Sequence, residues 1–145
     1  MATVSTYLNF PRNTEEAFTF YKSVFKTEFC APIARFGAQG CGDQPIAEGD
    51  QNLVMHVALP ILGGHLLMGT DAPESMGQKC VPGTNVYINL MPDTKAEADA
   101  LFAALSEGGK VECPMQDMFW GDYFGCLTDK FGIQWMIDVP NPPAP

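Results

Sequence analysis

The sequence predicts an α+β fold in which a β-α-β-β-β module occurs twice and the two modules form a curved mixed sheet. Three observations predict it. The alternating segment at residues 7–10 (YLNF) returns at residues 87–90 (YINL). Each copy of this segment is followed within a few residues by a helix start. The last strands expected in each half, at residues 65–71 and 133–138, also match in pattern. Matching elements in the same order indicate duplication of one supersecondary unit.

The first module is predicted to span about residues 4–72. Its helix begins after Asn13, in a segment that resembles a capping box, and its apolar residues recur every three and four positions. Gly63 and Gly64 are a two-residue hairpin signal between its last two strands. The strands expected in this module are Val4–Phe10, Glu28–Phe36, Asn52–Leu59 and His65–Thr70.

The second module is predicted to span about residues 84–139. Its helix begins after Thr94, again in a segment that resembles a capping box. A turn is expected around Asp129, before the final strand. Residues 140–145 are rich in proline and are expected to form an extended or disordered tail. The strands expected here are Asn85–Leu90, Lys110–Met115, Tyr123–Thr128 and Ile133–Val139.

Composition indicates a globular protein that binds neither nucleic acid nor anionic membrane surfaces. The chain has 145 residues, 46% of them hydrophobic, and a formal net charge of −9. That charge repels phosphate backbones and anionic lipid surfaces. The first ten residues lack the pattern of a secretion signal, so a cytoplasmic location is expected. The five cysteines form no C-x-x-C motif, which favours free thiols in a reducing compartment, with Cys41 and Cys80 as candidates for reactivity.

Each predicted module has one strand before its helix and three strands after it. A ferredoxin-like fold has only two strands per repeat, which argues against that fold. The chain instead resembles the vicinal oxygen chelate superfamily, which includes glyoxalase I, bleomycin-resistance proteins, fosfomycin-resistance enzymes and extradiol dioxygenases. Within it, the PhnB-like branch is the most similar. The resemblance extends from about Val4 to Val139 and is carried by residues 7–10 with Asn13, by residues 16–21 and 55–57, by residues 63–68 with Asp71, by residues 119–125 and by residues 128–136.

The resemblance implies a glyoxalase/bleomycin-resistance/dioxygenase-like fold that forms a cup and pairs as a homodimer. It also implies a divalent metal held by His, Gln or Glu on the first and last strands of each module. Those positions correspond to Thr6 and Met68 in the first module, and to Asn85 or Val86 and Met136 in the second. Methionine is a soft ligand that does not suit the ions these enzymes use. The sequence therefore predicts neither a superfamily metal site nor a cofactor.

The two histidines do not form an alternative metal site in the predicted register. A turn at Gly63 and Gly64 pairs His56 with Asp71 and leaves His65 about 20 Å away along the neighbouring strand. Each histidine is more simply a hydrogen-bonded structural residue. His56 is the better candidate for chemistry, because it lies on a strongly apolar strand and could act as a general base.

An aromatic segment at residues 119–124 surrounds the second candidate for chemistry, Asp122. A carboxyl group in an apolar wall would have a raised pKa and could transfer protons. The alternatives are that the rings fill the core and that Asp122 is a solvated turn residue. The residues expected to line a ligand-binding cup are Thr6, Met68, Trp120, Phe124, Trp135 and Met136.

The function expected from these features is binding of a small organic ligand in the cup without the superfamily metal, and whether the protein is an enzyme stays open. One alternative is a metal-dependent lyase, isomerase or transferase with atypical ligands. Another is a non-catalytic dimeric scaffold whose cup is filled by side chains. Proteins of the PhnB-like branch are sometimes called demethylubiquinone methyltransferases. The chain has neither a dinucleotide-binding glycine fingerprint nor a doubly wound pattern, which argues against that activity.

Overall fold

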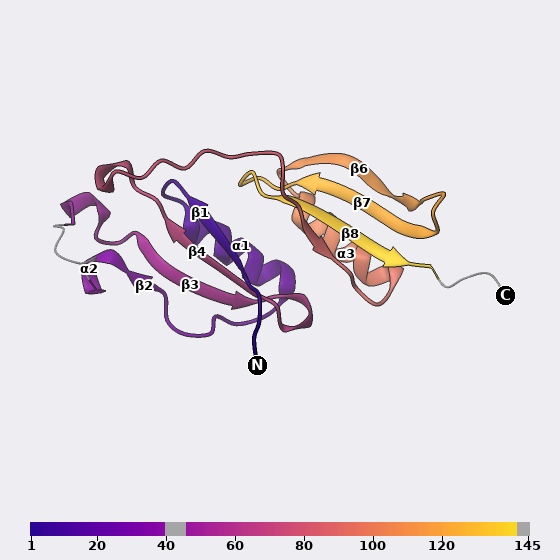
Figure 1. Ribbon diagram of the computed structural model, residues 1–145, viewed down its shortest axis with the longest axis horizontal. Coiled ribbons are helices and arrows are strands. Elements are labelled where there is room, and N and C mark those ends of the chain that lie inside the picture. Colours follow the sequence, from indigo (N-terminus) through magenta and orange to yellow (C-terminus); the bar gives the residue numbers. More distant parts are fainter. Residues whose placement is uncertain (40–45, 142–145) are drawn as a thin grey trace. The chain divides into compact units, whose positions relative to one another are not determined.

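The computed structural model describes residues 1–39 and 46–141, and the chain divides into two compact units, Met1–Val81 and Pro82–Pro145 (Figure 1). Each unit contains a β-α-β-β-β arrangement with a four-stranded mixed sheet. The α+β fold and the repeated module predicted from the sequence are therefore confirmed.

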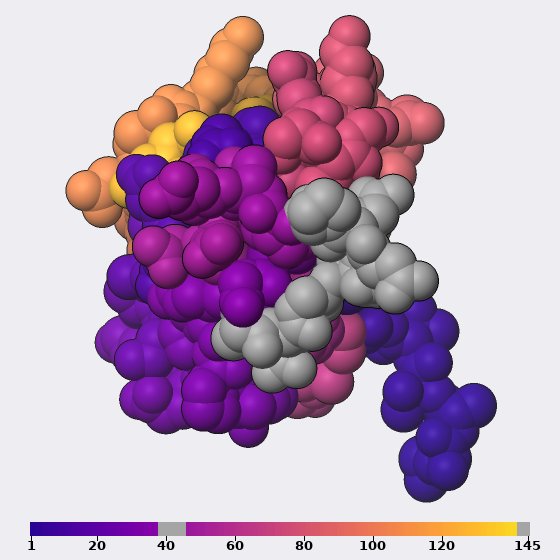
Figure 2. Space-filling view, turned by 90° about the vertical axis from the view of Figure 1, so that its left-hand side faces the viewer, coloured from indigo at the N-terminus to yellow at the C-terminus, as the bar shows by residue number. Residues whose placement is uncertain are grey.

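Unit 1, Met1–Val81, has the strand order β1-β4-β3-β2. Strands β1 and β4 run parallel and the other neighbours run antiparallel. Residues 1–5 extend from the body of this unit before the first strand (Figure 2). The elements of unit 1 are β1 (Thr6–Phe10), α1 (Thr14–Phe25), β2 (Ala34–Arg35), α2 (Phe36–Gln39), β3 (Val54–Pro60) and β4 (Leu66–Asp71).

Strand β2 is much shorter than the Glu28–Phe36 strand predicted from the sequence. Before Ala34, the backbone N–H of Cys30 donates to the carbonyl of Ala58, but the chain does not continue as a ladder. Pro32 has no N–H to donate, which explains why regular pairing is interrupted in this segment. The second strand of the module therefore contributes little to the sheet.

Helix α1 packs on one face of the unit 1 sheet, against β3 and β4. Its buried residues include Ala17, Phe18 and Tyr21, which follow the predicted spacing of three and four. Gly69 on β4 allows this close approach, because a Cβ there would lie 2.6 Å from Cε2 of Phe18. The core of unit 1 lies between this helix and the sheet, and we call the opposite face of the sheet the open face of the unit.

A buried carboxylate, not a capping box, holds the start of α1. Asn13 makes no side-chain capping bond, so the capping box predicted for this helix is wrong. The N–H of Thr14 donates instead to Oδ1 of Asp71 at 3.0 Å, and the N–H of Val54 donates to Oδ2 of Asp71 at 2.8 Å. Asp71 is only 1% exposed. One side chain from β4 thus connects the helix, β3 and β4.

Unit 2, Pro82–Pro145, repeats this order as β5-β8-β7-β6, with β5 and β8 parallel. The side chain of Thr94 accepts a 3.1 Å hydrogen bond from the N–H of Glu97, which confirms the cap predicted there. Strand β8 continues to Pro140, so this residue belongs to the last strand and not to the tail that the sequence predicted, and residues 142–145 lie outside the described range. The elements of unit 2 are β5 (Ile88–Leu90), α3 (Lys95–Ser106), β6 (Lys110–Asp117), β7 (Asp122–Thr128) and β8 (Gln134–Pro140).

Trp135 forms the centre of the unit 2 core and is completely buried. Its indole Nε1 donates a 2.8 Å hydrogen bond to Oδ2 of Asp129. Oδ1 of Asp129 accepts from the N–H groups of Phe131 and Ile133 at 2.8 and 3.1 Å. The turn predicted around Asp129 is therefore confirmed, and its carboxylate connects that turn to the core. As in unit 1, the open face is the sheet face opposite the helix, here α3.

The register of the two sheets refines the repeat. In unit 1, Tyr7 lies beside Met68, whereas in unit 2 Asn89 lies beside Met136. When the last strands are aligned through Met68 and Met136, Tyr7 therefore corresponds to Asn89, two residues beyond the Tyr87 that the sequence repeat aligns with it. A shift of two keeps every side chain on the same face.

Among the described residues, the structure contains no helix that is both long and apolar enough to cross a membrane.

Candidate functional site

The open face of unit 1 carries a tyrosine–histidine pair. Tyr7 on β1 and Met68 on β4 are register partners, so their side chains share this face. The hydroxyl of Tyr7 and Nδ1 of His56 are 3.1 Å apart and hydrogen-bonded, and their rings are 5.8 Å apart. The hydroxyl of Ser5 contacts the sulfur of Met68 at 4.0 Å. Two of the predicted site residues, His56 and Met68, thus lie on one surface.

Thr6 does not join them, although the sequence placed it with Met68 in the cup. Its register partner is Leu67, which is buried against the helix side of the sheet. Successive side chains of a strand point to opposite faces, so Thr6 and Tyr7 diverge. The hydroxyl of Thr6 is hydrogen-bonded to Nε2 of His65 at 2.9 Å, next to the β3–β4 turn. The first-strand residue that shares a face with Met68 is therefore Tyr7, one residue after the predicted Thr6.

The two histidines lie on opposite faces because the β3–β4 turn has three residues, Leu62–Gly64. The N–H of Ile61 donates to the carbonyl of His65 at 2.8 Å, which closes the turn. Val57 consequently pairs with Gly69, and the predicted pairing of His56 with Asp71 is wrong. The expectation that the histidines do not share one site agrees with this geometry, since each has a different hydroxyl partner.

The open face of unit 2 has a row of four register partners, one from each strand. Asn89, Met136, Cys126 and Cys113 follow one another across β5, β8, β7 and β6. Met136, a predicted ligand contact, lies near the middle of this row. The sulfur atoms of three neighbouring residues give the face an apolar, polarizable floor.

Above this floor, the carboxylate of Glu112 accepts hydrogen bonds from two hydroxyl groups. The hydroxyl of Tyr87 donates to Oε2 of Glu112 at 2.6 Å, and the hydroxyl of Thr128 donates to Oε1 at 2.5 Å. These bonds, that of Thr128 first, hold the pKa of Glu112 below its usual range, with burial opposing them. The bond to Glu112 in turn raises the pKa of Tyr87 to about 12. At neutral pH the pair is therefore a neutral phenol and a carboxylate.

Sequence reasoning missed Glu112 altogether. Tyr87 was visible in the strand echo, but the sequence does not indicate that Glu112 reaches across to it. Strand β6 is irregular on both sides of Cys113, and such bulges redirect side chains. The signal that could have led to this site is the tyrosine that opens both echoed segments, Tyr7 and Tyr87.

A second carboxyl cluster lies further along the open face of unit 2. Asp122 on β7 lies beside Asp138 on β8, next to Phe124, the register partner of Asp138. Burial, then the hydrogen bond and charge of Asp122, raise the pKa of Asp138 to about 6. Within the described part of the chain, Oδ1 of Asp138 is buried without a hydrogen-bond partner. The raised pKa predicted for a carboxyl group here thus falls on Asp138.

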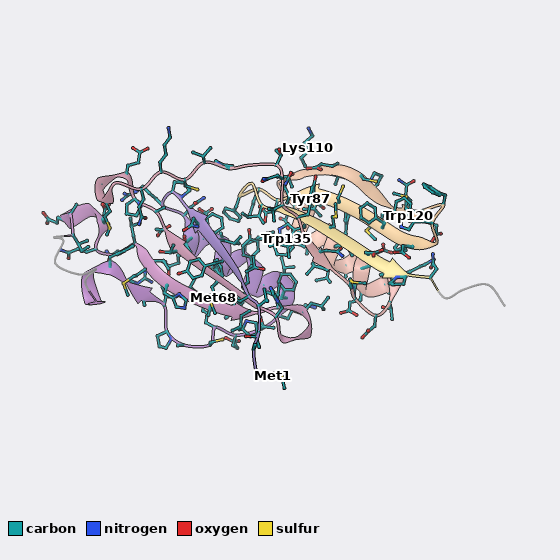
Figure 3. All side chains as sticks on the ribbon, in the orientation of Figure 1. Met1, Met68, Tyr87, Lys110, Trp120 and Trp135 are labelled. Atoms are coloured by element: carbon teal, nitrogen blue, oxygen red, sulfur yellow. The ribbon has the colours of Figure 1, made fainter. Side chains whose placement is uncertain are left out.

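The predicted aromatic wall is divided between two environments. Trp120 lies in the turn between β6 and β7 (Figure 3) and is 52% exposed. Its ring centre is 5.9 Å from that of Phe124. Phe119 beside it is 97% exposed. Trp135 instead pairs with Leu127 on the helix side of the sheet and is buried. It fills the core, as the alternative interpretation of these rings had it.

The last-strand residues at the superfamily metal positions are methionines, which suit a divalent metal poorly. Met68 and Met136 offer only thioether sulfur to an ion that prefers oxygen or nitrogen. Over residues 1–39 and 46–141, no group of three or more His, Cys, Asp or Glu side chains is arranged to hold a metal. Of the two cysteines expected in loops, Cys80 is half-buried and contacts the carbonyl of Asn9, and Cys41 lies outside the described residues.

Two mixed-sheet modules, each with one face covered by a helix, make up a fold of the glyoxalase/bleomycin-resistance/dioxygenase type. A family model called 3-demethylubiquinone-9 3-methyltransferase matches residues 2–138, and the chain belongs to that family. The predicted family resemblance is therefore confirmed.

Solved structures agree with this assignment. The chain is similar to protein PA1353 from Pseudomonas aeruginosa, at 32% identity and a TM-score of 0.81 over 98% of this chain and 100% of that one. A putative 3-demethylubiquinone-9 3-methyltransferase, PhnB protein, from Bacillus cereus is 24% identical, with a TM-score of 0.74 over 95% and 99% of the two chains. A glyoxalase/bleomycin resistance protein/dioxygenase family enzyme from Burkholderia phytofirmans is 18% identical, with a TM-score of 0.61 over 93% and 97%. The last two support the fold alone.

Proposed function

We propose that the protein binds a small organic molecule on the open face of unit 2 and that Glu112 is the group that recognises it. The observation that carries this proposal is an ionised carboxylate above an apolar floor. Two hydroxyl donors lower the pKa of Glu112, so it is charged at neutral pH. The floor beneath it is formed by Met136 and Cys126.

This combination favours a ligand with two parts. An ammonium or another strong hydrogen-bond donor would pair with the carboxylate of Glu112, since charge-assisted hydrogen bonds are the strong ones. An apolar body would lie against the thioether of Met136, which adapts to irregular shapes. The net charge of −9 also attracts cations to the protein.

The test is thermal denaturation in the presence of a series of small amines. Each amine is matched by a neutral and a carboxylate analogue with the same apolar body. We expect the amines to raise the midpoint of unfolding and the Glu112→Gln variant to lose most of that rise. Glu107→Gln, which removes one exposed carboxylate after α3, is the control and should keep it. A larger rise with the carboxylates, or an undiminished rise in Glu112→Gln, contradicts the proposal.

We also propose that this binding needs no divalent metal, because thioethers occupy the positions where superfamily ligands are expected. Elemental analysis of protein purified without chelators is the direct measurement. Zinc, nickel or manganese in a one-to-one ratio with the chain would contradict this part of the proposal. It would favour instead the metal-dependent alternative with atypical ligands.

The assembly and location of the protein are separate proposals. The superfamily resemblance favours a homodimer, and the acidic net charge of −9 suits a cytoplasmic protein. Light scattering coupled to size exclusion measures the mass in solution against 15.8 kDa for one chain. A monomer at micromolar concentration would contradict the homodimer.

A further inference from the structure

Two of the thiols face each other across the last hairpin. Cys113 on β6 and Cys126 on β7 are register partners in an antiparallel pair. Directly opposite residues in such a pair have Cα atoms about 4.5–5.5 Å apart. That range lies within the roughly 4.4–6.8 Å that disulfides span. Both cysteines are half-buried and reduced in this structure.

We propose that Cys113 and Cys126 are a reversible redox pair that closes into a cross-strand disulfide by exchange with a low-molecular-weight disulfide such as glutathione disulfide. Strand β6 departs from regular pairing on both sides of Cys113. Such bulges give the strand room to adjust when the sulfur atoms approach bonding distance. The proposal does not rest on the proposed binding function, although Cys126 is also part of the floor of that site.

The surroundings of the two sulfur atoms assign different roles to them. The side-chain amide of Gln116 donates to Sγ of Cys113 at 3.5 Å, so a hydrogen-bond donor is directed at this sulfur. The thiol of Cys126 instead donates to Oε2 of Glu112 at 3.9 Å. Burial, followed by the charge of Glu112, raises the pKa of Cys126. Cys113 is therefore the attacking thiol and Cys126 the resolving thiol.

The exchange proceeds in two displacements. The thiolate of Cys113 attacks one sulfur of the small disulfide, whose S–S bond breaks as a mixed disulfide forms, and the released small thiolate takes up a proton. Cys126 then gives its proton to water, and its thiolate attacks Sγ of Cys113. The mixed S–S bond breaks and the second small thiol leaves. Two protein thiols are oxidised to one disulfide while one small disulfide is reduced to two thiols.

The experiment uses the full chain with Cys30, Cys41 and Cys80 changed to Ser, so that only the proposed pair remains. It is incubated with glutathione disulfide and analysed by intact mass and by peptide mapping without reduction. We expect loss of the mass of two hydrogen atoms, no retained glutathione and a peptide pair linked through Cys113 and Cys126. Dithiothreitol should reverse all three changes. Two retained glutathiones, or two unreacted thiols, would overturn the proposal.

Single variants in the same background test the assigned roles. Cys126→Ser should trap glutathione on Cys113, because no resolving thiol remains. Cys113→Ser should react about tenfold more slowly, since the remaining thiol is the one held protonated. Equal rates for the two variants would overturn the role assignment. Mapping of linked peptides in the unsubstituted chain gives a second measurement if the background substitutions disturb folding.

Discussion

The hydroxyl of Tyr87 lies 2.6 Å from a carboxylate oxygen of Glu112, although the two residues belong to opposite edges of the unit 2 sheet. Tyr87 immediately precedes the edge strand β5, and Glu112 lies on the other edge strand, β6. Their side chains therefore meet over the two central strands. The contact fixes the carboxylate of Glu112 on the open face of unit 2 and lowers its pKa, which leads to the first prediction.

Removing either hydroxyl donor should raise the pKa of Glu112 toward its ordinary value. Thr128 lowers this pKa more than Tyr87 does. We therefore expect a larger rise in Thr128→Val than in Tyr87→Phe, measured by NMR titration of the Glu112 carboxyl carbon. Tyr7→Phe, which removes the corresponding hydroxyl from unit 1, should leave the titration unchanged. A larger effect of Tyr87→Phe would reverse the order of the two donors.

Asp138 should make the protein less stable as the pH rises from about 4 to about 6. Its pKa is raised to about 6 in the folded protein, mainly by burial and then by Asp122. An unfolded Asp titrates near pH 3.9, so between these values the folded state binds more protons. Stability then falls with increasing pH in this window and stays lower above it. Asp138→Asn removes the titrating group.

The measurement is the midpoint of thermal unfolding from pH 4 to pH 8 in the parent protein and in Asp138→Asn. The variant should lose the decline between pH 4 and pH 6 and should be the more stable of the two at pH 7. Asp122→Asn is the matched comparison. It removes the second and third causes of the shift but leaves burial, so the decline should persist at a lower pH. An unchanged profile in Asp138→Asn would be incompatible with this assignment.

Asp71→Ala should destabilise unit 1 strongly. It leaves the N–H groups of Thr14 and Val54 without their acceptor in a buried site. Each such loss costs about 1–3 kcal/mol. Asp71→Asn keeps one acceptor oxygen and should cost less. Urea denaturation measures both, with the exposed Asp93→Ala as the control, expected within about 0.5 kcal/mol of the parent. Equal stability of Asp71→Ala and the control would mean that these bonds contribute nothing.

Gly69→Ala tests how closely α1 approaches the sheet. The added Cβ would lie 2.6 Å from Cε2 of Phe18 and 3.3 Å from the carbonyl oxygen of Leu8. Overpacking of this kind costs about 1–3 kcal/mol. Gly49→Ala is the control, since a Cβ there meets nothing within 4 Å. If the two variants unfold at the same urea concentration, Phe18 moves aside more easily than the packing implies.

The repeat, most strands and the order of elements were predictable because alternation and helical spacing are local features of the chain. The face of the sheet on which each side chain lies was less predictable. The β3–β4 turn has three residues where Gly63 and Gly64 indicated two, and a shift of one residue reverses which side chains share a face. The start of α1 was misjudged because its partner, Asp71, is distant in sequence. Glu112 was missed because its direction depends on the irregular pairing of β6.

The partners of Tyr7 and Tyr87 also bear on how the molecule came to be asymmetric. Two identical subunits must carry identical surfaces, and any change made in one is made in both. Fusion of the copies into one chain removes that restriction. One tyrosine now meets an imidazole and the other a carboxylate. A substitution on either face can therefore be inherited alone, so one half can acquire a new specificity while the other keeps the old one.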